Sequence, residues 1–242
     1  MTMVTITKDS DISNVDFAEG ALILVDKPLG WTSFDVVNKI RFPLRKKYEK
    51  KKFKVGHNGT LDPLASGLLM IFTGKYTKRI PLEENHDKRY LGEVKLGATT
   101  VTLDREGDEV DINDVSHITK DQITSVAHSF LGEQIQEIPS YSATKVNGVA
   151  MYKLARQNKT FKPKSKTVFF HEISVLDYQE PIVSVDIKCG KGTYIRAFAR
   201  DLGLGLDSSA YLYALRRTEI AHYTVDDAID VHTICDMIND TF

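Results

Sequence analysis

The chain of 242 residues contains only two cysteines, Cys189 and Cys235, which lie far apart and outside any CxxC spacing. This excludes a disulfide framework and a cysteine-based zinc site, and predicts two small buried thiols. No apolar run approaches the ~20 residues of a membrane span. The first residues lack a basic segment followed by an apolar one, which a secretory signal would have. We therefore expect an intracellular, cytoplasmic protein that does not enter a membrane.

Several catalytic motifs are also missing. The segment Gly190–Thr193 reads GKGT, but Gly192 separates the lysine from the threonine and the upstream glycine of a P-loop is absent. No GxGxxG follows a predicted strand, and no GxSxG occurs. The seven histidines show no HExxH or other metal-ligand spacing. Nucleotide hydrolysis, dinucleotide redox chemistry, zinc hydrolysis and serine hydrolysis all lose support.

The net charge of −1 hides two basic segments. Arg41–Lys54 contains eight basic residues and one acid, Glu49, and Arg156–Lys166 contains five basic residues and no acid. Acidic residues gather instead in Asp104–Asp114. Local potential matters more than net charge for binding a polyanion. The two basic segments are therefore candidate nucleic-acid contacts, and their alternative interpretation is a solvated surface.

The N-terminal part of the chain predicts two buried strands and a helix between them. Residues 1–20 are polar and aperiodic, which predicts a loose arm. The apolar runs at 21–26 and 68–72 are each typical of a buried strand. Ser33 is the predicted cap of the intervening helix, and Pro43 is expected to end or kink it.

The rest of the chain alternates irregularly between strand and helix patterns. Thr119 and Gln122 fit a capping box at the start of an amphipathic helix that Gly132 would end. Further strands are predicted over 90–96, 167–176, 182–189 and 218–225, and further helices over 193–203, 210–217 and 231–240. Such a mixture predicts an α/β (α+β) fold with a mixed sheet.

One glycine-rich loop places a histidine and a carboxylate five residues apart. The segment Gly56–Pro63 reads GHNGTLDP and contains His57 and Asp62. A loop at the end of a central strand is a common place for chemistry. Asp62 also fits the N-cap of a helix, with Pro63 at its first position. The loop by itself leaves both interpretations open.

Six blocks of the sequence resemble, in the same order, the TruB-type tRNA pseudouridine synthases. GHNGTLDPLASGLL is similar to the central motif of that family, usually written GHTGTLDPLATGVL. The other blocks are LVDKPLGWTSFDVV, DKRYLGEVKLGATT, IPSYSATKVNGVAMYKLAR, KCGKGTYIRAFARDLG and LRRTEI, and together they cover about residues 21–232. The chain resembles the bacterial form that lacks a C-terminal PUA-type domain.

The resemblance implies that the protein isomerises a uridine in the T arm of tRNA, at tRNA position 55, to pseudouridine. It implies no metal and no cofactor, in agreement with the missing motifs. The implied fold is one catalytic domain over 21–242, with a mixed, mainly antiparallel central sheet flanked by helices and loops. Residues 128–166 would form a mobile RNA-gripping insertion. The tRNA T stem-loop is the expected partner, without a membrane or an obligatory protein partner, for a monomeric enzyme.

The resemblance also assigns catalytic residues. Asp62 matches the essential carboxylate, and Arg196 matches the arginine that pairs with it. Tyr90 matches the tyrosine that stacks on the target uracil. The ordinary interpretations are a surface ion pair for Arg196 and a core aromatic for Tyr90. The Lys27–Pro28 pair matches a segment that is structural in the family, so it is assigned no chemistry.

The remaining predicted site residues contact RNA. They are His57, which would help to hold the RNA after the target base leaves its stack, Tyr194 and Leu215 in the base pocket, and Lys145 and Arg156 in the gripping segment. Two positions depart from the family. Asn58 stands where threonine is usual, and Tyr211 stands where histidine is common. The first departure affects the local loop geometry, and the second affects one RNA contact that the resemblance implies.

Two alternative functions are compatible with the same sequence. The first is a pseudouridine synthase that acts on another RNA, alone or inside a ribonucleoprotein complex. The second is a tRNA-binding chaperone that works through its basic surface. The presence of Asp62, Tyr90 and Arg196 argues against loss of catalysis.

Overall fold

The structure of the protein is a computed structural model that describes residues 3–83 and 85–241. These residues form two compact units. The central unit is Tyr90–Leu215, and the terminal unit contains the described residues before and after it. The chain enters the central unit within β5 (Lys88–Leu96) and leaves it within β11 (Ala210–Ile220). This division differs from the predicted arm followed by one domain.

The terminal unit is built around the antiparallel pair β2 and β4. β3 pairs with β4 antiparallel, whereas β1 and β13 pair with β2 in parallel. A short strand, β12, pairs with the end of β11. The bounds are Thr5–Ile6 (β1), Leu22–Lys27 (β2), Val55–Asn58 (β3), Ala65–Thr73 (β4), Tyr223–Thr224 (β12) and Ile229–Asp230 (β13). The two predicted buried strands, now β2 and β4, are confirmed.

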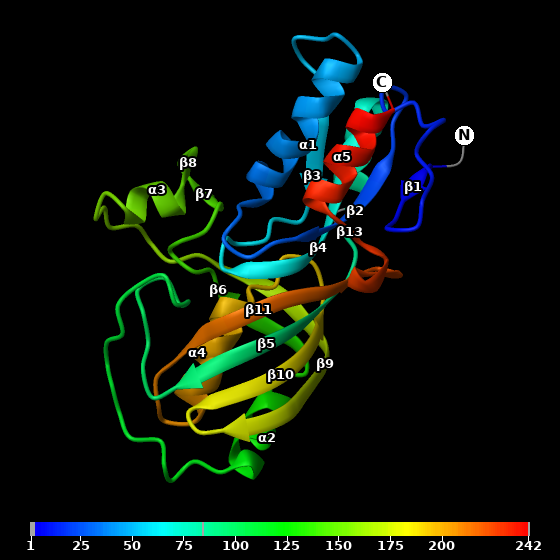
Figure 1. The fold of residues 1–242 in the computed structure, drawn as a ribbon. Helices are drawn as coiled ribbons and strands as arrows, with labels where there is room; N and C mark the ends of the chain where they lie inside the picture. The colour runs from blue at the N-terminus through cyan, green and yellow to red at the C-terminus, as the bar shows by residue number, and fades with distance from the viewer. Residues whose placement is uncertain (1–2, 84, 242) are drawn as a thin grey trace. The chain divides into compact units, whose positions relative to one another are not determined.

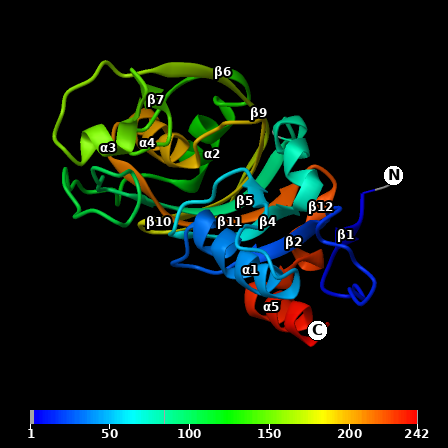
Figure 2. The same cartoon turned by 90° about the horizontal axis from the view of Figure 1, so that it is seen from above.

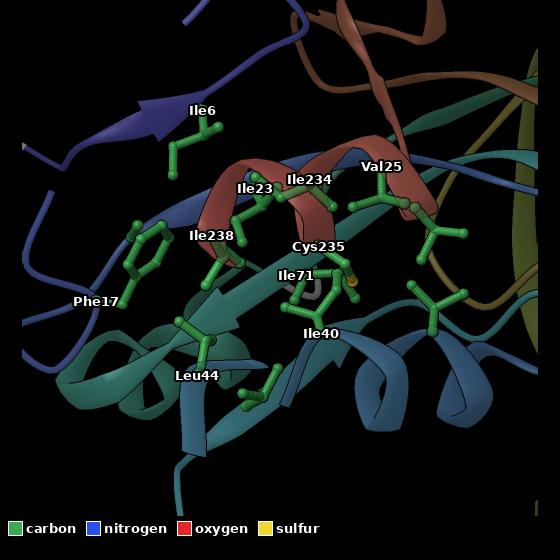
Figure 3. Close-up of a cluster of buried hydrophobic side chains, with 14 of the residues drawn as sticks. Ile6, Phe17, Ile23, Val25, Ile40, Leu44, Ile71, Ile234, Cys235 and Ile238 are labelled. Carbon is green, nitrogen blue, oxygen red and sulfur yellow. The ribbon is translucent and has the colours of Figure 1, made fainter. Parts of the chain in front are cut away.

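Both faces of this strand pair are buried. Because successive side chains of a strand point to opposite faces, Ile23 and Ile71 lie in the larger core cluster, shown in Figure 3. Leu24 and Met70 lie in a second cluster with Ile220. The continuous apolar runs of the sequence reflect this burial on two sides.

Two helices, α1 (Ser33–Lys47) and α5 (Val231–Asp240), lie side by side (Figure 1). Residues of both helices belong to the larger cluster. The cap of α1 is Thr32, whose hydroxyl accepts a hydrogen bond from the Asp35 amide at 3.0 Å. The prediction of Ser33 as the cap is therefore wrong. Pro43 lies inside α1 and does not end it. A proline costs one helical hydrogen bond, and Pro43 and the next residue are buried in compensation.

The first described residues are not a loose arm. Thr5 and Ile6 form β1, and the side chains of Ile6, Ile12 and Phe17 are buried in the larger core cluster. The prediction failed because three widely spaced apolar residues in a polar segment have no periodicity, although they are enough to hold the segment down. Two 3-10 helices, η1 (Gly74–Leu82) and η2 (Val225–Asp227), complete the terminal unit.

The central unit contains a sheet with strand order β11-β5-β10-β9-β6 (Figure 1). The long strand β9 (Ser165–Gln179) pairs antiparallel with β10 (Ile182–Cys189) and with β6 (Gly132–Glu137). A separate hairpin joins β7 (Lys145–Val146) to β8 (Val149–Ala150). Together with the parallel pairs of the terminal unit, these pairings confirm an α/β (α+β) fold with mixed, mainly antiparallel sheet structure.

The helices of the central unit are α2 (Lys120–His128), α3 (Met151–Ala155) and α4 (Ile195–Gly205). α2 packs on α4 and β9, as seen in Figure 2. The predicted capping box of Thr119 and Gln122 is confirmed. However, α2 ends at His128, four residues before Gly132. Both cysteines of the chain are free and buried, as expected.

One predicted helix is a strand. Residues 210–217 are rich in alanine, leucine and arginine, which favour helix, but they form the first part of β11. β11 is an inner strand with a hydrogen-bonded neighbour on each side. Tertiary pairing thus overrides local propensity. In the described part of the chain, no helix has the length and apolar character needed to cross a membrane.

Candidate active site

The glycine-rich loop that contains Asp62 connects β3 to β4 in the terminal unit. Its backbone is fixed by three hydrogen bonds. The Leu61 amide donates to the Ser33 hydroxyl at 2.8 Å, the Gly30 amide donates to the Pro63 carbonyl at 2.8 Å, and the Ala65 amide donates to the Asp62 carbonyl at 3.0 Å. No helix follows, because β4 begins at Ala65. Asp62 is therefore half-buried in a turn and is not a helix N-cap.

Arg217 supports this loop from inside the protein. Its side chain is only 1% exposed. The Nε atom donates to the Leu68 carbonyl at 2.7 Å, and Nη2 donates to the Gly59 carbonyl at 2.9 Å. Gly59 has a φ of +70°, and an added Cβ would lie 3.3 Å from Arg217 Nη1. The backbone conformation and the guanidinium together explain the glycine at this position.

Lys27 brings a second buried cation to the same region. Its side chain is fully buried, and its ammonium donates to the carbonyls of Pro28 at 3.0 Å and Trp31 at 2.6 Å. Burial lowers the pKa of Lys27 to about 8, while the negative charge of Asp62 acts in the opposite direction. The repulsion from Arg217 lowers this pKa further. Lys27, Asp62 and Arg217 therefore form one electrostatically coupled group.

His57 lies in β3, just before the loop. Its Nδ1 atom is buried and has no hydrogen-bond partner among the described residues. Burial lowers the pKa of His57, and the positive charge of Arg217 adds to this effect. His57 is therefore mainly neutral at pH 7. The adjacent Asn58 is buried, and its side-chain amide donates to the Glu83 carbonyl.

Arg196 lies in α4 of the central unit and is 6% exposed. It donates to the carbonyls of Thr102 at 2.8 Å and Tyr141 at 3.0 Å. Its Nε atom lies 3.7 Å from Asp104 Oδ2. Asp104 is held in turn by the Thr102 hydroxyl, which donates to Oδ1 at 2.6 Å. The interpretation of Arg196 as an ordinary surface ion pair is therefore wrong.

Tyr194 precedes α4 and is fixed through its backbone. Its amide donates to the Gln136 side-chain oxygen at 2.8 Å, and the Gln136 amide group donates to the Tyr194 carbonyl at 3.1 Å. Its hydroxyl lies 3.2 Å from the Thr144 hydroxyl. The Lys166 ammonium lies 4.2 Å from the centre of the tyrosine ring, within cation–π range. The ring therefore has a defined position.

Tyr90 and Leu215 are the first and last residues of the central unit. Tyr90 is on β5 and is 8% exposed, and Leu215 is half-buried on β11. Tyr211, the departure from the family pattern, is also buried on β11, and its hydroxyl donates to Glu109 Oε1 at 2.5 Å. Burial and this carboxylate both raise the pKa of Tyr211.

The predicted gripping segment contains regular structure. Asn147 and Gly148 have φ values of 50° and 82°, as the tight turn of the β7–β8 hairpin requires. The Met151 amide donates to the Thr144 carbonyl at 2.8 Å, so α3 is attached to the hairpin. Lys145 and Arg156 are exposed, and Arg156 lies 3.9 Å from Glu106. The mobility of residues 128–166 stays a prediction.

The structure thus brings His57 and Asp62 together in the terminal unit, and places Tyr90, Arg196, Tyr194 and Leu215 in the central unit. The predicted pairing of Arg196 with Asp62 stays a prediction. Sequence reasoning missed three residues: Lys27, Asp104 and Arg217. Lys27 and Arg217 belong to blocks that resemble the family, but they were assigned no role. Asp104 is one of several acidic residues in Asp104–Asp114, and nothing in the sequence distinguishes it from the others. Within residues 3–83 and 85–241, no cluster of His, Cys, Asp or Glu could hold a metal.

Comparison with known proteins identifies close relatives. Residues 45–195 match the TruB family pseudouridylate synthase N-terminal domain. The chain is 42% identical over 224 residues to the tRNA pseudouridine synthase B of Parabacteroides distasonis, covering 93% of this chain and 95% of that protein. It is 45% identical over 221 residues to the tRNA pseudouridine synthase B of Chloroherpeton thalassium, covering 91% of each.

Solved structures give a similar result. A chain in the crystal structure of a Cbf5-Nop10-Gar1 complex superposes with a TM-score of 0.68 at 26% identity over 96% of this chain. A chain in an H/ACA RNP bound to a substrate RNA containing 2'-deoxyuridine gives a TM-score of 0.65 at 27% identity over 91% of this chain. The present chain spans only 58% and 53% of the lengths of those two chains.

Proposed function

The chain belongs to the TruB family of pseudouridylate synthases, and we propose that it converts a uridine of tRNA to pseudouridine. The observation that carries this proposal is the similarity to proteins named tRNA pseudouridine synthase B, which extends over 93% of the chain in the Parabacteroides distasonis relative. We propose further that the target is the uridine at position 55 in the T arm. The blocks of sequence that resemble the family throughout the chain support this assignment.

Asp62 is the proposed essential carboxylate. A carboxylate can act as a nucleophile, as a base, or as a stabiliser of positive charge that develops on the sugar. The loop around Asp62 is fixed by Ser33 and Arg217, which suits a group that must meet a reacting sugar in one position. Lys27 supplies a buried positive charge beside it.

The other predicted residues handle the RNA in this proposal. The target base must leave its stack, which costs a few kcal/mol. Tyr90, Tyr194 and Leu215 receive the uracil, and Arg196 pairs with Asp62 when the substrate is bound. The neutral, planar side chain of His57 suits the space that the base vacates. The exposed cations Lys145 and Arg156 contact the RNA backbone as part of residues 128–166.

The direct test uses the purified protein and an unmodified tRNA transcript. Pseudouridine is mapped by carbodiimide labelling and primer extension, with Asp62→Asn alongside as a variant of nearly equal shape. A single new stop at the T-arm uridine, absent from the variant, is expected. A stop that persists in Asp62→Asn would remove Asp62 from the chemistry. No stop with wild type, despite tight binding of tRNA, would favour a chaperone or another RNA target.

We also propose that the enzyme works as a monomer in the cytoplasm without an obligatory protein partner. The structural relatives come from multi-protein complexes, so the point needs its own test. Full conversion of the transcript by the purified chain, which elutes at the size of a monomer, is the expected result. Activity that appears only after addition of a cell extract would contradict it.

A further inference from the structure

An open cavity of about 460 Å³ lies in the terminal unit, where the end of α1 and the loop after it meet the start of β3. Five of the residues that line it are cations and none is an acid. The cations are Arg41, Arg45, Lys51, Lys52 and Lys54. Because the whole chain has a net charge of −1, this local excess of positive charge is a specific feature of the cavity.

No carboxylate neutralises these cations in the described part of the chain, where the ion pairs involve other residues. The single acid of the basic run, Glu49, does not line the cavity. Like charges that gather without partners repel one another, which destabilises the folded state. A cavity lined by positive side chains also concentrates the positive electrostatic potential, so it attracts anions.

The wall formed by α1 is held in a fixed shape. The guanidinium of Arg41 donates to Asn38 Oδ1 at 2.7 Å and to the Val55 carbonyl at 3.0 Å. It also lies 5.6 Å from the centre of the Phe34 ring. These contacts use two of the five N–H donors of the arginine. Arg41 is thus oriented before any ligand arrives, which lowers the entropy cost of binding.

The loop after α1 is anchored as well. Phe53 is 7% exposed, and its ring lies 5.0 Å from the ring of Tyr48. The Lys50 amide donates to the Arg45 carbonyl at 3.0 Å, and the Gly74 amide donates to the Lys54 carbonyl at 2.9 Å. The backbone that carries Lys51, Lys52 and Lys54 is therefore anchored by the buried ring of Phe53 and by these two hydrogen bonds.

We propose that this cavity binds backbone phosphates of the RNA substrate. Arginine and lysine are the usual phosphate ligands, arginine through paired N–H donors and lysine as a point charge. A cavity of this volume accepts more than one phosphate, because pockets for drug-sized ligands start at about 300 Å³. The inference rests on the proposed function, since RNA is the polyanion that the enzyme must hold.

The position of the cavity selects one part of the RNA. Gly56 lines the cavity, and Asp62 follows six residues later. Six residues span at most about 22 Å. A stacked strand that rises about 3.4 Å per nucleotide covers this distance in roughly six nucleotides. We therefore expect the phosphates in the cavity to lie within roughly six nucleotides of the target uridine, a range that reaches into the adjoining stem.

Two triple variants with equal loss of charge test the proposal. The cavity variant is Arg45→Gln/Lys51→Gln/Lys52→Gln, which leaves the structural contacts of Arg41 intact. The control variant is Lys8→Gln/Lys39→Gln/Lys50→Gln, which removes three exposed lysines of the same unit that do not line the cavity. Each is titrated at several salt concentrations with a T-arm hairpin, and with the same hairpin whose stem is cut by half.

The cavity variant is expected to bind the full hairpin about tenfold more weakly than wild type at 0.1 M salt. Its plot of log affinity against log salt should be shallower by about 0.7 to 0.9 for each phosphate that the protein no longer neutralises. The control variant should bind like wild type, and the shortened hairpin should not distinguish the three proteins. Conversion of saturating RNA should be unchanged in the control variant.

Equal weakening by the two triple variants would overturn the proposal, because the effect would then come from net charge alone. An unchanged affinity of the cavity variant for the full hairpin would overturn it as well. Failure of the proposed function has a different signature, namely no pseudouridine in tRNA with wild-type protein. In that case the comparison of full and shortened stems still decides whether the cavity binds RNA phosphates.

Discussion

Nη2 of Arg217 donates a hydrogen bond to the Gly59 carbonyl at 2.9 Å, three residues before Asp62. The same guanidinium donates to the Leu68 carbonyl at 2.7 Å. Arg217 therefore joins the start of the loop that presents the proposed catalytic carboxylate to β4, the strand that follows the loop. We infer that Arg217 positions Asp62 through these two bonds to the backbone.

Arg217→Lys keeps the charge but cannot reproduce two bonds from a planar group. We expect kcat to fall at least tenfold while KM changes little, because the RNA-binding surface is untouched. We expect the free energy of unfolding to fall by about 1–3 kcal/mol, the cost of one unsatisfied buried partner. Steady-state kinetics on a tRNA transcript and urea unfolding measure the two effects. A change in KM with kcat preserved would contradict a positioning role.

The buried pair of Asp104 and Arg196 supports a second prediction. Asp104→Asn removes the negative charge that lies 3.7 Å from Arg196 Nε, in a site where both side chains are at most 10% exposed. Unfolding should become easier by about 1–3 kcal/mol, and activity should fall because Arg196 loses a fixed orientation. Chemical denaturation and single-turnover conversion of tRNA measure these effects.

The matched control for Asp104 is Glu106→Gln in the same acidic segment. Glu106 lies 3.9 Å from Arg156, and both side chains are more than half exposed. Exposed pairs of this kind contribute little to stability. The control should therefore unfold like wild type. Equal losses of unfolding free energy in the two variants would show that the burial of Asp104 does not strengthen its contribution to stability.

Elements with strong local signals were predictable from the sequence. The capping box of Thr119 and Gln122 needs only contacts between neighbours in sequence, so it appeared as expected. The alternating burial of β10, in which Val183 and Val185 are buried, follows from the period of a strand. Asp62 was singled out through a motif that resembles the family, and its catalytic role stays a prediction.

The features that were predicted wrongly or missed depend on residues that are distant in the sequence. Residues 210–217 form a strand because other strands flank them. Pro43 is tolerated inside α1 because the helix is buried at this point. Phe17 packs into the larger core cluster, and the sequence around Phe17 gives no sign of that contact. Lys27 was given no chemistry because nothing local shows that its ammonium is buried beside Asp62.

Gly59 gives a third prediction about the loop. Gly59→Ala places a Cβ at a φ of +70° and 3.3 Å from Arg217 Nη1. We expect a loss of about 1–3 kcal/mol in unfolding free energy together with a clear loss of activity, since the guanidinium must move. Gly30→Ala is the control, because Gly30 has a φ of +84° but nothing within 4 Å of an added Cβ. It should lose stability through backbone strain alone and keep most of its activity.

Lys27 leads to a prediction about pH. Its pKa is about 8 in the folded protein, whereas the ordinary lysine value of 10.5 applies to the unfolded chain. Between these values the unfolded state binds more protons, so stability should rise as pH increases through this window. From pH 7.5 to 9.5 the rise should be about 1–2 kcal/mol, measured by urea unfolding as the difference between wild type and Lys27→Met.

The variant Asp62→Asn tests the electrostatic link behind this behaviour. The negative charge of Asp62 raises the pKa of Lys27 against the effect of burial. Without that charge the pKa of Lys27 should fall below 8, and the pH at which stability begins to rise should move down with it. If the rise starts at the same pH in Asp62→Asn and in wild type, the two groups are not coupled. The buried ammonium would then owe its low pKa to burial and to Arg217, and the proposed cation beside the catalytic carboxylate would lose its support.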